Sequence, residues 1–178
     1  MGLDLEWAAE MTRGFSGVRG RFESVNLGQG FSVIVDFAHT PDSLRNVLVA
    51  ARKLGDGKLI SVFGCGGDRD RTKRPRMGAV SRELADFTIV TSDNPRSEEP
   101  SAITAEIAAG MGPVDQAWTV ILDRRSAIRH AVAMAAPGDV LVIAGKGHET
   151  YQIFRDRTIH FDDVEEARQA IGELMKGV

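Results

Sequence analysis

Short apolar runs alternate with amphipathic segments along most of this chain. The runs, such as FSVIVDF and DVLVIAG, are rich in β-branched residues, which is typical of buried strands. The segments between them carry apolar residues at helical spacing, as at Leu44, Val47, Leu48 and Ala51. The pattern predicts strands over residues 31–37, 58–64, 86–91, 118–123 and 139–145, alternating with helices over 40–54, 75–84, 102–111, 124–135 and 163–175.

Strands that alternate with helices form βαβ units and a mainly parallel sheet. We therefore expect an α/β fold, a three-layer Rossmann-like domain with about five or six strands flanked by helices. Local signals support the first long helix, since Thr40 can cap it, Pro41 stands at its first position and Asp42 lies in its first turn. The remaining expected elements are a short helix over residues 4–12 and a short strand pair around 151–154 and 157–161.

Four loops are expected to meet at one edge of this sheet. In open parallel sheets, ligands bind beyond the carboxyl ends of the strands. The loops that follow the predicted strands at this edge are also the most polar and glycine-rich parts of the chain. The fold and the composition therefore indicate the same edge for a site, built from residues 36–42, 64–74, 91–99 and 145–151.

Composition narrows the class of protein. The 178 residues are about the size of one domain, and 43% hydrophobic with 26% charged residues predicts a globular chain. A net charge of −3 gives no indication of a nucleic-acid partner, and no apolar run approaches a membrane span. Cys65 is the single cysteine, so we expect no internal disulfide and a cytoplasmic location. The four histidines and Cys65 are scattered without metal-ligand spacing.

The loop GCGGDRDRTKRP combines glycines with basic residues. Glycines expose backbone N–H groups, and with Arg69 among the added cations the loop suits an anion. It is not a dinucleotide fingerprint, because Arg69 stands in place of the third glycine, and the chain has no GK[ST] phosphate loop. The alternative is a solvated loop whose cations pair with Asp68 and Asp70.

Two further loops carry candidate polar groups. In AGKGHE, Gly145 brings the backbone close to a partner, Glu149 can accept from an ammonium and His148 could act as a base; the alternative is a plain turn. In VDFAHTP, Asp36 ends a strand and turn chemistry explains most of the stretch, but His39 is left unexplained.

The stretch DNPR stands directly after a predicted strand. Pro95 fixes its own φ angle and keeps Asn94 out of the helical region of backbone conformations. Asn94 and Arg96 are therefore held on a stiff segment that has little conformational entropy left to lose. Arg96 offers a planar fork that matches a carboxylate or a phosphate. The alternative is an Asx-type turn closed by a surface ion pair between Arg96 and Glu98 or Glu99.

The order of GVRGRFE, VDFAHTPDSL, FGCGGDRDRTKRPRMG, TSDNPRSEEP and AGKGHETYQ resembles the C-terminal domain of the Mur ligases. The resemblance covers residues 15–178, whereas residues 1–14 resemble only the last helix of the family's central ATPase domain. The stretch DNPR, followed by an acidic pair and a proline, resembles the sequence found in the branch of the family that adds meso-diaminopimelate. One departure is Phe37, where the family usually has tyrosine.

The resemblance implies a part in an ATP-driven amide ligation in peptidoglycan synthesis. A D-glutamate carboxylate of the UDP-MurNAc-dipeptide would attack the γ-phosphate of ATP, and the amine of meso-diaminopimelate would then displace phosphate. In the family, ATP and Mg are held mainly by the central domain, so we expect a monomer that is inactive alone and holds no catalytic residue or metal ligand.

The resemblance also implies a site. Arg69 and Arg96 would bind carboxylates, and Glu149 would bind an ammonium. Arg21 and Asp36 would reach the nucleotide, and His39 and His148 are further candidates. The implied substrate residues are Arg69, Asp93, Asn94, Pro95, Arg96, Gly145 and Glu149.

Two other functions stay open at this stage. One is the ligase domain of a cyanophycin- or folate-type synthetase, which would not be expected to carry DNPR. The other is a stand-alone amino-acid or nucleotide sensor without catalysis. An in-frame phosphate loop upstream of the chain would exclude the sensor function.

Overall fold

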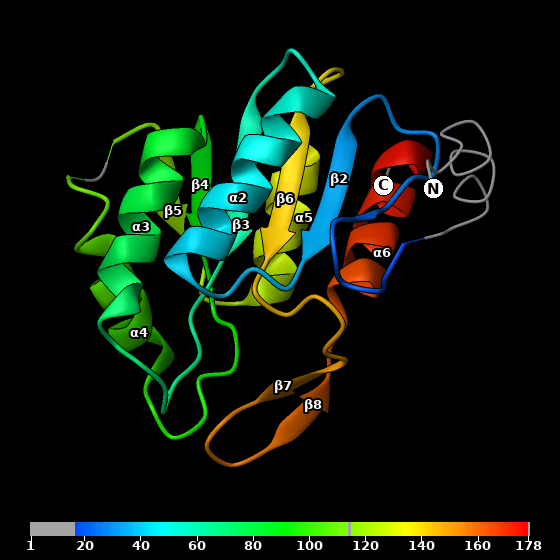
Figure 1. Ribbon diagram of the computed structural model, residues 1–178. Helices are drawn as coiled ribbons and strands as arrows, with labels where there is room; N and C mark the ends of the chain where they lie inside the picture. The colour runs from blue at the N-terminus through cyan, green and yellow to red at the C-terminus, as the bar shows by residue number, and fades with distance from the viewer. Residues whose placement is uncertain (1–16, 114, 178) are drawn as a thin grey trace, which may run out of the picture.

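The computed structural model describes residues 17–113 and 115–177. Its main feature is a six-stranded sheet in the order β1-β2-β6-β3-β4-β5, in which only β1 runs antiparallel to its neighbour (Figure 1). The expected α/β class and mainly parallel sheet are therefore confirmed. The helix expected over 4–12 and the domain remnant over 1–14 lie outside the described residues. The strands are β1 (Glu23–Ser24), β2 (Ser32–Asp36), β3 (Leu59–Phe63), β4 (Phe87–Val90), β5 (Trp118–Val120) and β6 (Val140–Ala144).

Helices cover both faces of the sheet and form the outer layers. One core cluster joins α2, α3 and α4 to one face, and a second joins α5 and α6 to the other. Successive residues of β6 alternate between the two clusters, with Val142 in the first and Ile143 in the second. The helices are α2 (Pro41–Ala51), the short 3-10 helix η1 (Arg52–Leu54), α3 (Lys73–Leu84), α4 (Pro100–Ala108), α5 (Arg124–Met134) and α6 (Asp163–Lys176).

Local sequence signals predict the start of α2 correctly, but they place the starts of α3 and α4 too late. Thr40 caps α2, and its side chain exchanges hydrogen bonds with Ser43 as the cap signal predicts. The expected start of α3 at Pro75 is wrong by two residues, since the helix begins at Lys73. Asp70 accepts from the backbone N–H of Thr72 and leads into the helix, so Pro75 lies in a first turn that tolerates proline. The helix expected over 102–111 likewise begins earlier, with Pro100 in its first turn.

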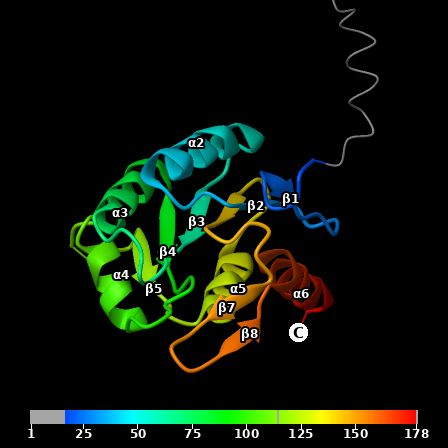
Figure 2. The same ribbon diagram turned by 60° about the horizontal axis from the view of Figure 1, so that its bottom comes forward.

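The strand pair expected around 151–154 and 157–161 is present, and it forms a small antiparallel hairpin apart from the main sheet. It pairs β7 (Tyr151–Ile153) with β8 (Thr158–His160) and lies at the carboxyl edge of the sheet, at the bottom of Figure 1. The hairpin contacts the DNPR stretch, because the backbone N–H of Arg96 donates to the carbonyl of Ile153 over 3.0 Å. Figure 2 brings this edge forward and shows the hairpin in the lower part of the picture.

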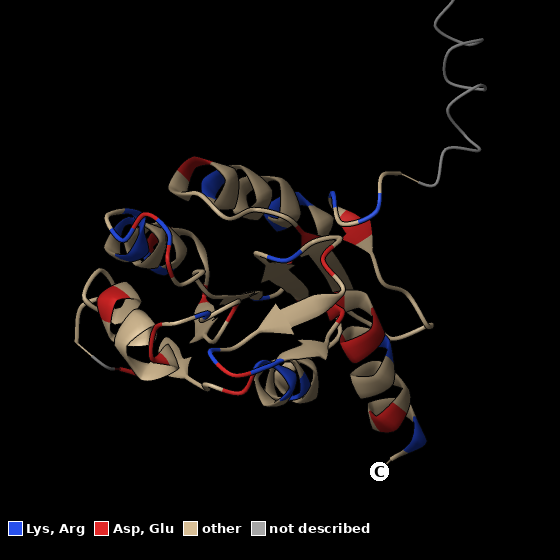
Figure 3. Cartoon of the chain, turned by 90° about the horizontal axis from the view of Figure 1, so that it is seen from below, with Lys and Arg blue, Asp and Glu red and all other residues tan. Residues whose placement is uncertain are grey.

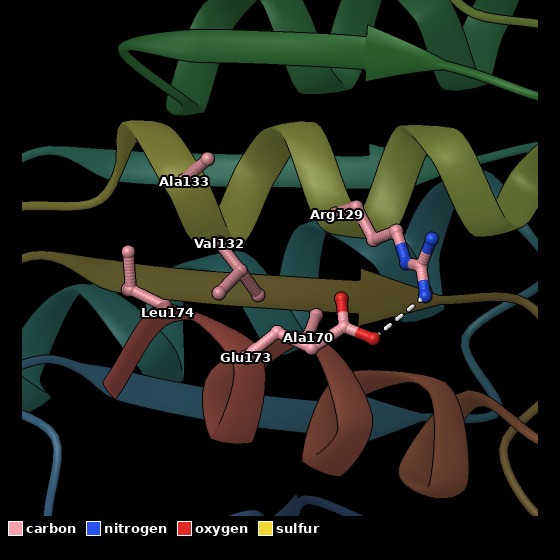
Figure 4. A pocket seen from close by; sticks show the side chains of 6 residues that line it. All are labelled: Arg129, Val132, Ala133, Ala170, Glu173 and Leu174. Atoms are coloured by element: carbon pink, nitrogen blue, oxygen red, sulfur yellow. Dashed lines mark hydrogen bonds and ion pairs between the residues drawn. The ribbon is translucent and has the colours of Figure 1, made fainter. Parts of the chain in front are cut away.

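Helices α5 and α6 pack side by side on the second face of the sheet. Val132 and Ala170 line a shallow groove of about 160 Å³ between them, which an ion pair from Arg129 to Glu173 bridges over 2.9 Å (Figure 4). Both partners of this pair are about two-fifths exposed. In the part of the chain that the structure describes, no helix is long and apolar enough to cross a membrane.

Candidate functional site

The four polar loops converge on one cleft of about 380 Å³ at the carboxyl edge of the sheet. Figure 3 looks onto this edge and shows basic and acidic segments interleaved around it. The expectation that these loops share one edge is confirmed. The site residues that line the cleft come from all four loops, and the full lining is Phe37, His39, Thr40, Gly66, Arg69, Asp70, Lys73, Asp93, Asn94, Arg96, Gly145 and Glu149.

The glycine-rich loop packs directly against the DNPR loop. The N–H of Gly67 donates to the carbonyl of Asn94 over 2.8 Å, and Nη1 of Arg96 donates to the carbonyl of Gly67 over 2.8 Å. A Cβ at Gly67 would lie only 1.9 Å from the carbonyl oxygen of Pro95. This glycine is therefore needed for the close approach of two loops, and its N–H is already used within the chain. Pro95 itself does not line the cleft.

Arg96 lines the cleft, and backbone carbonyls hold one end of its guanidinium. Its φ of 51° places it in the left-handed region, an unusual conformation for a residue with a side chain. Besides the bond to Gly67, Nη1 lies 3.4 Å from the carbonyl of Asn94. Among the described residues, Nη2 and Nε of Arg96 have no hydrogen-bond partner, so part of the planar fork stays open to a ligand in the cleft.

The ion pairs that the alternative explanations of these two loops assumed are not the ones that form. Glu98 forms a bidentate pair with the buried Arg74 over 2.8 and 2.9 Å, and not with Arg96. Asp68 accepts from Ser97 instead of pairing with a cation of its own loop. Arg71 pairs with Glu106 of α4, whereas Arg69 donates to the backbone carbonyl of Asp68 in its own loop. These contacts join the loop of Arg69 to the loop of Arg96.

The Arg74–Glu98 pair predicts an acid-sensitive site. Hydrogen bonds from Arg74 and from the backbone of Asp68 lower the pKa of Glu98 from 4.5 to about 2. A lowered folded-state pKa stabilises the folded chain above the unfolded value and loses that effect as the pH falls from about 4.5 to about 2. We expect Glu98→Gln to flatten the dependence of unfolding free energy on pH in this window, measured by denaturant titration. An unchanged pH dependence would contradict the role of the pair.

Asp93 and Glu149 form an acidic side of the cleft, and they surround a lysine that the sequence analysis did not single out. Lys146 is fully buried, and its ammonium lies 3.2 Å from Oδ1 of Asn94, 3.3 Å from Oε2 of Glu149 and 3.5 Å from Oδ1 of Asp93. Asn94 also donates to Glu149 over 2.8 Å. The available signal was the position of Lys146 between two glycines after a strand, Gly145 and Gly147, both of which have positive φ.

The residues expected to reach a nucleotide lie beside the cleft. The guanidinium of Arg21 stacks over the ring of Phe37 at 4.9 Å, and the rings of His39 and His148 lie 4.6 and 5.0 Å from Phe37. One carboxylate oxygen of Asp36 accepts from a backbone N–H of the preceding turn over 2.7 Å. Arg21, His39 and His148 therefore gather around the ring of Phe37, and Nδ1 of His39 also lies 3.0 Å from the backbone carbonyl oxygen of Phe37.

Comparison with protein families gives one match. The model of the family described as "Mur ligase, glutamate ligase domain" matches residues 20–147. These residues hold all six strands of the main sheet and the whole of three of the four loops. The match therefore covers the part of the chain that forms most of the cleft.

Individual relatives agree with this family. The chain is 57% identical over 162 residues to a UDP-N-acetylmuramoyl-L-alanyl-D-glutamate--2,6-diaminopimelate ligase of Syntrophomonas wolfei, covering 90% of this chain and 32% of the relative. It is 56% identical over 178 residues to the ligase of the same name from Thermosynechococcus vestitus, covering 99% of this chain and 36% of the relative. A solved structure of a ligase of this name superposes with a TM-score of 0.84 at 41% identity, covering 98% of this chain and 36% of that one. The chain thus spans about a third of the length of the relatives it matches.

Proposed function

Since the chain belongs to the Mur ligase family through its glutamate ligase domain, we propose that it is the amino-acid-binding part of a ligase that joins meso-diaminopimelate to UDP-N-acetylmuramoyl-L-alanyl-D-glutamate. The relatives that carry this name match nearly the whole chain, although the chain spans only about a third of each. The reaction is an ATP-dependent amide ligation, in which this domain presents the amine that attacks an activated carboxylate.

The observation that carries the proposal is the balance of charge in the cleft. Arg69, Lys73 and Arg96 line it together with Asp93 and Glu149, and Asp70 completes three cations against three anions. A polyanion such as a nucleotide would meet repulsion from half of these groups. An amino acid that carries both carboxylates and ammonium groups pairs with both halves, and meso-diaminopimelate has two of each.

Individual roles follow from the same balance. The open part of the Arg96 fork and the nearby Arg69 bind the carboxylates, and Glu149 accepts from an ammonium. Asn94 has its oxygen engaged by Lys146 and by the N–H of Ile153, so it mainly holds the two sides of the cleft together. Gly145 keeps the strand end close to Asp93, because a Cβ there would lie 3.2 Å from Oδ2 of Asp93.

ATP and the UDP-linked substrate are bound mainly by the rest of the ligase, with a magnesium ion. Within the described residues, no three histidine, cysteine or carboxylate side chains are placed to hold a metal ion. The cluster around Phe37 supplies Arg21 and, with Asp36, contacts the nucleotide when the two parts close on one another. The domain extent over 15–178, the cytoplasmic location, the monomeric state and the lack of ATP turnover by the chain alone stay predictions.

Binding of the free amino acid tests the proposal. We expect meso-diaminopimelate to shift backbone NMR signals of the ¹⁵N-labelled chain around Arg69, Asn94, Arg96 and Glu149 in a saturable way at millimolar concentration. Pimelate, the same dicarboxylate without its ammonium groups, is the control and should bind at least tenfold more weakly, since each lost charge-assisted pair weakens binding by about that factor. If meso-diaminopimelate leaves these signals unchanged, the proposed function is wrong.

A further inference from the structure

The buried Lys146 has no place in the roles given above, although it lies at the centre of the acidic side. Its side chain is fully buried, and three oxygens surround the ammonium at 3.2 to 3.5 Å. An ammonium has three N–H groups, so this set matches its full donor capacity. A buried cation is tolerated only when it is paired and hydrogen-bonded, which is the case here.

Backbone geometry directs this lysine inward. Gly145 and Gly147 have φ of 119° and 52°, and a Cβ at Gly147 would lie 2.6 Å from the Cβ of Phe37. With a glycine on each side, the chain turns sharply after β6 and places Lys146 under the cleft. Its ammonium there lies 5.6 Å from the centre of the Tyr151 ring, which covers it from the hairpin side.

Lys146 acts on Glu149 in a specific way. Oε2 of Glu149 accepts from both Lys146 and Asn94, whereas Oε1 has no partner within 17–113 and 115–177. The carboxylate is therefore pinned by one oxygen and offers the other to the cleft that it lines. The second carboxylate, Asp93, shares the same ammonium, so Lys146 also relieves repulsion between the two acids.

We propose that Lys146 is a positioning residue, which fixes Glu149 so that its free oxygen recognises an ammonium group of the amino-acid substrate. The inference rests on the proposed function. Two effects of removing Lys146 have opposite signs, which makes the role testable. Loss of a cation would make the acidic side more negative and strengthen ammonium binding, whereas loss of the anchor would free Glu149 to turn toward solvent and weaken it. A positioning role requires the second effect to be larger.

The test is a double-mutant cycle with two ligands on the full chain. Lys146→Met keeps the length of the side chain without its charge, and Glu149→Gln keeps the shape of its partner. We expect Lys146→Met to reduce the preference for meso-diaminopimelate over pimelate by about tenfold, the size of one hydrogen bond to a charged group. In the Glu149→Gln background, Lys146→Met should change that preference by less than about twofold, because the two residues act as one unit.

Controls separate a positioning role from general loosening of the fold. Ile128 lies in the core between α5 and the sheet. Ile128→Val should lower the stability of the chain and leave the preference for meso-diaminopimelate over pimelate unchanged. If Lys146→Met raises the preference, leaves it unchanged, or lowers it equally with and without Glu149, the inference is wrong. The wild-type chain binding meso-diaminopimelate in the same experiment would leave the proposed function standing, so the two failures are distinct.

A measurement on the unmodified chain serves if Lys146→Met does not fold. Because Lys146 is fully buried, its ammonium protons should exchange slowly enough to give a ¹⁵N side-chain signal. We expect meso-diaminopimelate to shift this signal through Glu149, and pimelate to leave it in place. A signal that moves equally with both ligands, or with neither while meso-diaminopimelate binds, overturns the proposal.

Discussion

Replacing Asp163 with alanine is expected to lower the free energy of unfolding by about 3–5 kcal/mol, because it leaves a buried guanidinium without its counter-charge. Arg124 and Asp163 are both fully buried, and two hydrogen bonds of 2.8 Å join them. Arg124 also donates to the carbonyls of Ala144 over 3.0 Å and Ser92 over 3.4 Å. The pair therefore ties the starts of α5 and α6 to the ends of β4 and β6, directly beneath two loops of the cleft.

The same two helices provide a matched control. Arg129 and Glu173 also form an ion pair between α5 and α6, but both are about two-fifths exposed (Figure 4). Solvent screens such a pair, and Glu173→Ala should change stability by less than about 1 kcal/mol. Denaturant unfolding of both variants gives the comparison. Equal effects at the buried and the exposed pair would show that burial of Arg124 does not determine its contribution.

A double variant separates the pair from its surroundings. Arg124→Met with Asp163→Leu removes both charges and should cost less than the sum of the two single changes, since no isolated charge remains. It should not restore full stability, because the carbonyls of Ser92 and Ala144 lose their donor. Additive losses in this cycle would contradict direct coupling between Arg124 and Asp163.

The fold could be predicted from sequence because its signals are local. Each buried strand is an apolar run, each helix has a repeat of apolar residues, and Thr40 with Pro41 sets a start that neighbours alone determine. The helix starts predicted at residues 75 and 102 are each two residues late, because a proline in the first turn of a helix resembles a boundary. The convergence of the four loops followed from the parallel sheet alone.

The buried charges of the site could not be predicted in the same way. Lys146, Arg74 and Arg124 are charged residues, which by type are expected at the surface. Their partners Asp93, Glu98 and Asp163 lie 53, 24 and 39 positions away in the chain. Only the folded chain brings such pairs together, so neither spacing nor composition indicates them. The same limit explains why an ion pair between Arg96 and Glu98, part of the alternative left open for DNPR, is not found: Glu98 pairs with the buried Arg74.

Replacing Arg96 with alanine is expected to weaken binding of meso-diaminopimelate by about 100-fold and binding of L-lysine by less than about threefold. The two amino acids share a carbon chain and the reacting amine, and differ by one distal carboxylate. The open part of the Arg96 fork gains a charge-assisted pair with that carboxylate. With lysine the guanidinium would meet only an ammonium, and its unsatisfied donors would add to the cost. Sites of this kind can reject the poorer analogue by roughly 10⁴-fold.

Arg96→Lys provides a sharper comparison than alanine. It keeps the positive charge, so a purely electrostatic role predicts nearly full recovery. The observed geometry predicts little recovery, because Nη1 is engaged by the carbonyl of Gly67 and the proposed role needs the other N–H groups for the carboxylate, and one ammonium cannot reproduce both functions. Arg45→Ala is the control, because it removes the same charge from an exposed ion pair with Glu83 between α2 and α3. It should leave the binding of both amino acids unchanged.

The measurement is the ratio of binding constants for meso-diaminopimelate and L-lysine in the chain, and of kcat/KM for both in the full-length ligase. General damage to the cleft would weaken both amino acids together and leave the ratio constant, whereas loss of the fork lowers the ratio through meso-diaminopimelate alone. The left-handed backbone at Arg96 adds a check, since Arg96→Gly keeps that conformation without strain and should match alanine in the ratio. A ratio unchanged in all three variants would mean that DNPR only shapes the loop, with discrimination carried by Arg69 or by the rest of the ligase.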